Sequence, residues 1–536
     1  MKWIAPAERD AATRSLETRL WEAADQLRAN SDLKSQQYSQ PVLGLIFLRF
    51  ADVRFAARRK ELEKAATSSR RGSRVDDPEA YHSTGVLYLS VDARFDHLLE
   101  LPEGAAVGKA LNEAMRDIEK HNSQLAGVLP KTYETFNSTL LKQLLKKISE
   151  IPATLDYDGF GRVYEYFLGE FAKSEGQKGG EFFTPSSIVR LLVEVIEPYH
   201  GRILDPACGS GGMFVQSARF VAEHKKNPSA ELSIHGQEKV AETARICRMN
   251  LAVHGLEGDI REAITYYDDP HDATGKFDFV LANPPFNVNA VDKERLETDV
   301  GLARRYPFGM PRTDNANYLW IQLFYSALNE RGRAGFVMAN SASDARSSEL
   351  ELRRKLIEER AVDVVVTVGS NMFYTVTLPV TLWFLDRGKK NKKRANEVLF
   401  IDARHIYRQI DRAHRDWTEE QIGFIANLVR LWRGEELDFT LGRNGAKEKL
   451  VEVFGRKPKF VSLPGLCRAA TISDVEAKGW SLNPGRYVGV APGEEMEDED
   501  FRERFTALRE EFQALLVQAH DLERLIEENS AKVLQG

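Results

Sequence analysis

Residues 203–212 read Ile-Leu-Asp-Pro-Ala-Cys-Gly-Ser-Gly-Gly, and this stretch decides the fold class. A short β-rich run ends at Asp205, a glycine-rich turn follows, and a helical pattern starts at Gly212. Glycine lets the backbone pass close to a ligand, and the first strand–helix turn of a doubly wound sheet is where nucleoside ligands bind. The spacing matches neither a dinucleotide fingerprint nor a P-loop. A ligand without a pyrophosphate is therefore favoured over a simple tight turn.

The pattern around this turn predicts an α/β domain from about residue 151 to 490. Strand-like runs lie at 202–204, 232–235, 277–282, 334–338, 362–368, 380–385 and 398–401, with helical runs at 212–224, 240–254, 318–330 and 347–359. Such alternation predicts a mainly parallel, doubly wound, Rossmann-like sheet. The last two strand runs have no helix between them, which predicts an antiparallel pair at one edge.

The two ends of the chain have different patterns. Residues 1–150 carry apolar side chains at helical spacing and predict a helical N-terminal domain. From Phe501 to Val533, apolar residues recur at alternating steps of four and three, as in a coiled coil. Residues 491–536 therefore predict a C-terminal helix that binds another protein or packs back onto its own domain.

The composition describes an ordinary globular protein of two or three domains. The chain has 536 residues, of which 43% are apolar and 29% charged, with a net charge of −6. This balance excludes a generally basic nucleic-acid binder but leaves room for a basic face. The three cysteines form no Cys-x-x-Cys pair and the histidines show no ligand spacing, so no metal site is predicted. The chain shows no signal core or membrane-spanning run, and a cytoplasmic location is expected.

Asn283-Pro284-Pro285-Phe286 follows the strand-like run 277–282. Two prolines make the loop stiff, because each fixes its φ angle and lacks an N–H. The Asn283 carboxamide can donate and accept hydrogen bonds, and Phe286 offers a face for stacking. The combination suits a flat ring with an exocyclic amino group. The alternative is a simple turn, since Asn-Pro is a common turn former.

Two further segments carry polar groups near predicted helix starts. Glu238 follows the next strand, where an acidic side chain either binds ribose hydroxyls or favours a helix start. In the segment 181–186, Thr184 is expected to be a helix N-cap, with Pro185 at the first helical position. The aromatic pair before it could close over a bound carboxylate.

These motifs together resemble a known family. Asp-Pro-x-Cys-Gly-Ser-Gly followed by Asn-Pro-Pro-Phe looks like an S-adenosyl-L-methionine-dependent methyltransferase that modifies the N6 amine of adenine. The preceding Glu-Phe-Phe-Thr-Pro, the helical front and the coiled-coil tail narrow the resemblance to the modification (M) subunit of type I restriction–modification systems. Residues 250–255 and 481–488 are also similar to that family, so the resemblance covers nearly the whole chain.

The resemblance implies roles for individual residues. The cofactor loop would be Asp205 with Gly209, Ser210, Gly211 and Gly212, and Glu238 would bind the ribose. The methionine end would be covered by Glu181, Phe182, Phe183, Thr184, Pro185 and Ser186. The cofactor adenine would lie near Thr265 and its neighbours, although Ile264 departs from the polar residue usual there. Asn283 and the Pro284 carbonyl would accept hydrogen bonds from the target amine within the Asn283-Pro284-Pro285-Phe286 loop, with Phe286 stacked on the base.

The resemblance also implies partners. These are duplex DNA, a specificity (S) subunit bound by two M copies, and a restriction (R) subunit, with no membrane. One rival class is a methyltransferase acting on protein glutamine or ribosomal RNA, which uses similar loops. Another is a scaffold that binds S-adenosylmethionine or DNA without turnover. The basic run of Lys389, Lys390, Lys392, Lys393 and Arg394 is either a solvated loop or a DNA phosphate contact.

Overall fold

The computed structural model describes residues 1–5, 35–68, 74–152, 157–175, 184–312, 315–373, 379–411 and 414–490, with single residues at 21 and 509. The predicted coiled-coil helix therefore lies outside the described residues, apart from Arg509. The same holds for Glu181, Phe182 and Phe183 of the segment before the first helix of the α/β region.

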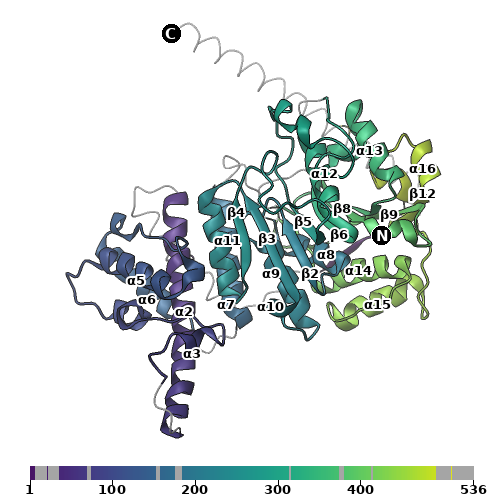
Figure 1. The fold of residues 1–536 in the computed structure, drawn as a ribbon. Helices are drawn as coiled ribbons and strands as arrows, with labels where there is room; N and C mark the ends of the chain where they lie inside the picture. Colours follow the sequence, from purple (N-terminus) through teal and green to yellow (C-terminus); the bar gives the residue numbers. More distant parts are fainter. Residues whose placement is uncertain are drawn as a thin grey trace.

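Nine strands of the described residues form one sheet, in the order β12-β9-β7-β8-β6-β5-β2-β3-β4 (Figure 1). The strands are β2 Gly201–Asp205, β3 Leu232–Glu238, β4 Gly258–Glu262, β5 Phe277–Ala282, β6 Leu328–Ala339, β7 Val362–Thr367, β8 Val380–Asp386, β9 Glu397–Asp402 and β12 Cys467–Thr471. Parallel pairing joins β2 to β3 and β5, β3 to β4, β5 to β6, and β7 to β9. The predicted, mainly parallel sheet is confirmed.

The predicted antiparallel pair between the last two strands is wrong. β8 lies inside the sheet, antiparallel to both β6 and β7, while β9 pairs in parallel with β7. All seven residues of β8 are buried, as expected for a strand covered on both faces. The antiparallel edge strand is instead β12, whose short sequence gave no strand signal. The predicted helix at 318–330 also ends early, at Ala327, because β6 begins at Leu328.

Helices cover both faces of the sheet. One face carries α8 Ser186–Ile196, α9 Gly212–Glu223, α11 Ala241–Val253 and α14 Glu419–Arg433, with α10 Pro228–Glu231 and α15 Arg443–Phe454 nearby. The other carries α12 Asn317–Ala327, α13 Ser348–Glu358, α16 Ile472–Ala477 and α17 Gly485–Val488. Along β2, Ile203 joins the first core and Leu204 the second, as the period of a strand requires. The doubly wound prediction is confirmed.

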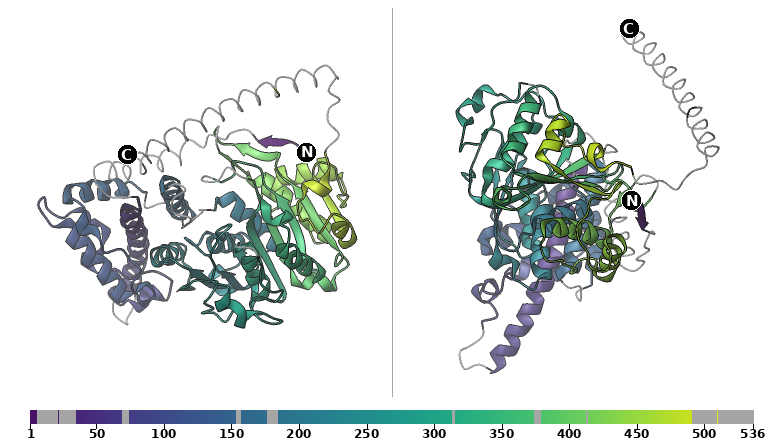
Figure 2. Two further views of the ribbon diagram at one scale, coloured as in Figure 1. Left: turned by 90° about the horizontal axis from the view of Figure 1, so that it is seen from above. Right: turned by 90° about the vertical axis from the view of Figure 1, so that its right-hand side faces the viewer.

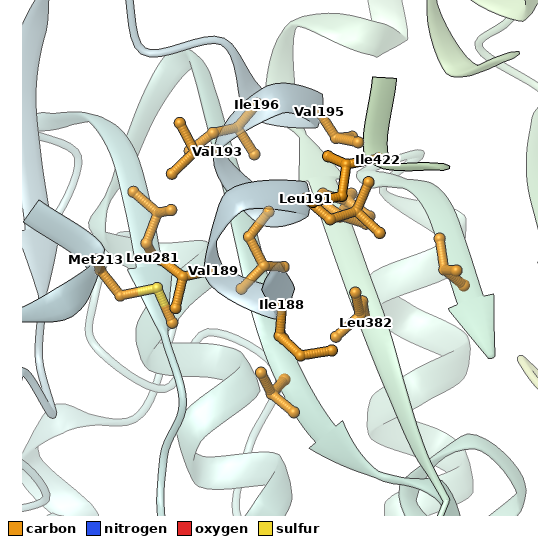
Figure 3. Close-up of a cluster of buried hydrophobic side chains, with 14 of the residues drawn as sticks. Ile188, Val189, Leu191, Val193, Val195, Ile196, Met213, Leu281, Leu382 and Ile422 are labelled. Atoms are coloured by element: carbon orange, nitrogen blue, oxygen red, sulfur yellow. The ribbon is translucent and has the colours of Figure 1, made fainter. Parts of the chain in front are cut away.

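α8 is buried over most of its length. Its residues 188–196 are all buried, and Figure 3 shows their aliphatic side chains beside Met213, Leu281, Leu382 and Ile422. The helix therefore packs against α9, α14 and the centre of the sheet at once. This packing holds the residues just before α8 in a defined place over the sheet.

The helical N-terminal region is confirmed and has its own apolar core. Its helices are α2 Ser35–Ser68, α3 Glu79–His82, α4 Phe95–Leu99, α5 Val107–His121, α6 Ser138–Ser149 and α7 Tyr157–Glu175. Met249 and Val253 of α11 belong to this core, so the region packs against the α/β region beside the β4 edge (Figures 1 and 2). The limits of the domains, near residues 150 and 490, stay a prediction.

A second, small sheet joins β1 Trp3–Ala5, β10 Ile406–Gln409 and β11 Arg415–Asp416. It places the first residues of the chain beside β10. In the part of the chain that the structure describes, no helix has the length and apolar composition needed to cross a membrane.

The basic run between β8 and β9 is only partly a surface loop. Lys389 is fully buried and donates to the carbonyls of Val362 and Glu397, and burial lowers the pKa of its ammonium group to about 8. Arg394 is also buried and forms ion pairs with Asp363 and Asp386. Neither reading of the run, as a solvated loop or as a DNA contact, fits these two residues. Lys390, Lys392 and Lys393 are exposed.

Candidate functional site

The sheet brings three of the predicted motifs to one edge. Asp205 ends β2, Glu238 ends β3, and Asn283 follows β5, and these three strands run parallel. The backbone N–H of Gly209 donates to Glu238 Oε2 at 3.1 Å, which ties the glycine turn to the end of β3. The other oxygen, Oε1, accepts from the Val240 N–H at 3.0 Å. Glu238 therefore links the glycine turn to the entry of α11.

The turn after β2 requires glycine at positions 209 and 211. Gly209 and Gly211 have φ angles of 51° and 85°, which other residues rarely adopt. A Cβ on Gly211 would also lie 2.8 Å from Cys247 Sγ. Asn250 on α11 donates from Nδ2 to the Ser210 carbonyl at 2.9 Å. The turn is thus held from α11, while Cβ atoms built on Gly209 and Gly212 meet nothing within 4 Å.

Asp205 is buried beside this turn. Its Oδ1 accepts from the Ala207 N–H at 3.0 Å. Burial raises the pKa of Asp205 to about 8, the Ala207 hydrogen bond offsets part of this rise, and the Glu238 charge adds to it. The carboxyl group is therefore largely protonated at neutral pH in the free chain. A bound cation would favour its ionised form.

Thr184 contacts the motif after β5 and does not cap a helix. α8 begins at Ser186 with Pro185 in the N-cap position, and no side chain caps it. The prediction that Thr184 is the N-cap is wrong because the helix starts one residue later than the sequence predicts. The Thr184 hydroxyl instead accepts a 2.9 Å hydrogen bond from Asn283 Nδ2. Pro185 is buried and Ser186 is exposed.

The loop after β5 is stiffened from the other face of the sheet. Pro284 is buried, while Pro285 and Phe286 are half-buried, and Phe286 packs against the core under α8. Asn287 follows with a φ of 52°. Its N–H donates to Asn317 Oδ1 and its Oδ1 accepts from Asn317 Nδ2, both at 2.9 Å. Sequence reasoning missed this Asn287–Asn317 pair, because 30 positions separate the two residues.

Thr265 lies next to the cofactor loop predicted from the sequence. It is buried, and its hydroxyl donates to the Pro206 carbonyl at 2.5 Å. Arg305 donates to the carbonyls of Thr265 and Tyr266, the latter at 3.1 Å. Arg305 therefore orders this segment, while the neighbouring Ile264 side chain is 40% exposed.

Comparison with known families matches almost the whole chain. The model of the N-6 DNA Methylase family matches residues 155–496, and that of the HsdM N-terminal domain matches residues 16–148. The chain is 37% identical to the Type I restriction enzyme MjaIX methylase subunit of Methanocaldococcus jannaschii over 96% of this chain and 91% of that protein. It is 34% identical to the HindI methylase subunit of Haemophilus influenzae, over 80% of this chain and 94% of that protein.

Solved structures agree on the fold. The chain superposes on a type I restriction–modification system methyltransferase subunit from Streptococcus thermophilus with a TM-score of 0.69 and 22% identity, covering 89% of this chain and 100% of that one. A chain from a structure concerning complex assembly of the type I restriction–modification system gives a TM-score of 0.57 at 20% identity, covering 98% and 99%. At these identities, the two structures support the fold alone.

Gly211→Ala should destabilise the chain, and Gly212→Ala should not. A left-handed conformation costs a residue with a Cβ about 1–2 kcal/mol, and contact with Cys247 adds to this cost. Gly212 lies in the first turn of α9 with open space beside it. Denaturant unfolding followed by circular dichroism measures both variants. Equal free energies of unfolding for the two would contradict the strain assigned to Gly211.

Asp205→Asn should stabilise the ligand-free chain at high pH. The folded-state pKa of about 8 lies above the ordinary aspartate value of 3.8, so folding favours the protonated form. This contribution is fully present below pH 3.8 and is lost as the pH rises through 8. Because the loss begins above pH 3.8, the variant should gain much more in free energy of unfolding over the wild type at pH 9 than at pH 4. The exposed Asp292, changed to Asn, is the matched control. An equal gain at both pH values would contradict the raised pKa.

Proposed function

Because the chain belongs to the N-6 DNA Methylase family, among the methylase subunits of type I restriction enzymes, we propose that it methylates the N6 amine of adenine in DNA. The observation that carries this proposal is the position of Asn283-Pro284-Pro285-Phe286. The tetrapeptide follows β5, beside the glycine turn after β2. A methyl donor held by the turn and an amine held by the loop would meet at the same edge of the sheet.

The residues present fit S-adenosyl-L-methionine. The turn leaves open space at Gly209 and Gly212, and Asp205 offers a buried carboxyl group that a cationic amine would ionise. We assign Asp205 and residues 209–212 to the amino-acid part, Glu238 to the ribose and Thr265 to the neighbourhood of the adenine. Residues 181–186 would cover the methionine end. The cofactor supplies an electrophilic methyl group, so the protein mainly has to align donor and acceptor.

Asn283 and Pro284 would act on the target amine. The adenine nitrogen is a poor nucleophile because its lone pair is delocalised into the ring. Two acceptors, Asn283 Oδ1 and the Pro284 carbonyl, would draw the amine towards tetrahedral geometry and so return the lone pair to nitrogen. Thr184 supports this role, since it takes a hydrogen bond from Asn283 Nδ2 and thereby orients the amide.

The target base must leave the duplex to reach this edge. Flipping costs a few kcal/mol, and stacking on Phe286 would return about 1–3 kcal/mol. Pro284 and Pro285 keep the loop from rearranging when the base enters. The loop is thus pre-organised for one flat ring rather than for a flexible side chain, which favours a nucleobase over protein glutamine.

We further propose that recognition and assembly depend on partners. The chain would act with a specificity subunit that selects the DNA site, as two methylase copies to one specificity subunit, and with a restriction subunit in the full complex. Duplex DNA would be the substrate and the cytoplasm its location. The heptad pattern after residue 500 supports a partner contact.

Asn283→Ala should strongly reduce the rate of methylation while leaving cofactor binding intact. Loss of one pre-organised hydrogen-bonding group in an active site costs on the order of 10²–10³ in rate. The measurement is labelled-methyl transfer to duplex DNA with the specificity subunit present, beside cofactor binding by calorimetry. Asn444→Ala, on an exposed position of α15, is the control. Methylation at the wild-type rate by Asn283→Ala would refute the proposed mechanism.

Deletion of the chain after Gly493 should abolish association with the specificity subunit. A point variant on the heptad seam, Leu515→Asp, should weaken association, whereas Gln518→Asp, off the seam, should not. Size-exclusion chromatography of the mixed subunits measures this. A complex that survives the deletion would mean that the heptad packs within its own chain.

A further inference from the structure

Three potential metal ligands meet on the sheet away from the site described above. His235 lies on β3, Asp259 on β4 and His271 in the segment after β4, and one ligand atom of each lies within 4.8 Å of the others. His235 and Asp259 are register partners on neighbouring parallel strands. The sequence shows no metal-ligand spacing because the three residues are brought together by strand pairing and a returning segment.

The hydrogen bond of His271 defines its protonation. Its Nε2 lies 3.1 Å from the Gly236 carbonyl oxygen, which can only accept, so Nε2 carries the hydrogen. In a neutral ring Nδ1 then presents a lone pair. This atom lies 3.5 Å from Asp259 Oδ2, and the His271 side chain is only 2% exposed. Two electron-rich atoms therefore face each other unless a cation lies between them or His271 carries a second proton.

His235 has a free ring nitrogen. Its Nε2 lies 3.0 Å from the Ser233 hydroxyl. Its Nδ1 is buried and has no hydrogen-bond partner within the described ranges. A buried polar atom without a partner is costly and calls for an explanation. Donation of Nε2–H to Ser233 would leave the Nδ1 lone pair available to a metal ion, in the manner of histidine ligands whose other nitrogen is hydrogen-bonded.

We propose that His235, Asp259 and His271 bind one transition-metal ion of the zinc class, with solvent completing its coordination. The donor set, two imidazole nitrogens and one carboxylate oxygen, is typical of Zn²⁺ and Co²⁺. Asp259 has a side chain that is 41% exposed, which gives the ion a way in. Arg261 holds this carboxylate, with its Nε 2.5 Å from Oδ1 and its Nη2 3.3 Å from Oδ2.

The local charge favours a nitrogen-binding metal. Arg261 offsets the charge of Asp259, and Arg202 lies nearby over the ring of Phe277. Affinity must therefore come from the imidazole nitrogens rather than from negative charge. This selects Zn²⁺ over Mg²⁺ or Ca²⁺, which require oxygen ligands. The bound ion would tie β3 and β4 to the segment that also carries Thr265, and this proposal does not depend on the proposed function.

Titration of the metal-free full-length chain tests the proposal. Co²⁺ should give the visible absorption of a nitrogen-coordinated ion at one equivalent, and Zn²⁺ should displace it. His235→Gln and His271→Gln should each weaken Zn²⁺ binding by more than about 100-fold, and Ser233→Ala by about 10–100-fold, as expected for a residue that orients a ligand. His97→Gln, at an exposed histidine on α4, should bind Zn²⁺ as the wild type does.

The thermal stability of the wild-type chain gives a second test of the metal site. Zn²⁺, but not Mg²⁺, should raise the Tm of the wild-type chain, and this measurement needs no substitution. Circular dichroism establishes that the variants are folded. A wild type that binds Zn²⁺ no more tightly than folded His271→Gln would overturn the proposal. The contact with Asp259 would then be explained by a doubly protonated His271.

Discussion

Parallel pairing of β2 with β3 on one side and β5 on the other is the constraint on which the site depends. Asp205 is the register partner of Gly236, and Leu204 is the partner of Val280. Because the carboxyl ends of parallel strands meet at one edge, the glycine turn, Glu238 and the Asn283 loop come together there. Both cores of the α/β region, one on each face, serve to hold these strands in register.

The residues of the site lower the free energy of unfolding, and contacts in the surrounding structure offset this loss. Asp205 is buried with a raised pKa, and Gly211 occupies a conformation that only glycine adopts readily. α8 carries the compensating contacts. Its C-terminal neighbour Glu197 forms ion pairs with Arg430 of α14 and Arg333 of β6, each at 2.8 Å. These partly buried pairs hold the C-terminal end of α8, and Thr184 lies just before its N-terminal end. A fixed α8 therefore helps to keep Thr184 in contact with Asn283.

The basic run at residues 389–394 has a structural role that its sequence did not predict. Lys389 and Arg394 read as surface residues, because a cluster of basic side chains between two strands is normally solvated. The insertion of β8 between β6 and β7 brings Asp363 and Asp386 close to Arg394, and brings carbonyl oxygens to Lys389. Arg394 thus offsets the charge of two buried carboxylates, and Lys389 donates hydrogen bonds to backbone carbonyls of β7 and β9. Local sequence could not reveal this, since the partners lie on other strands.

The sequence by itself determined the features with a local physical cause. Strand and helix periodicity predicted most of the sheet, the glycine-rich stretch predicted a tight turn after β2, and Asn283-Pro284-Pro285-Phe286 predicted a stiff, polar loop after β5. Only the tertiary structure decided that Thr184 contacts Asn283, that Asn317 holds Asn287, that β8 lies inside the sheet, and that His235 meets His271. Turn chemistry and periodicity act between neighbours in the chain and leave a pattern in it. Contacts between distant segments depend on strand order and register, which leave no such pattern.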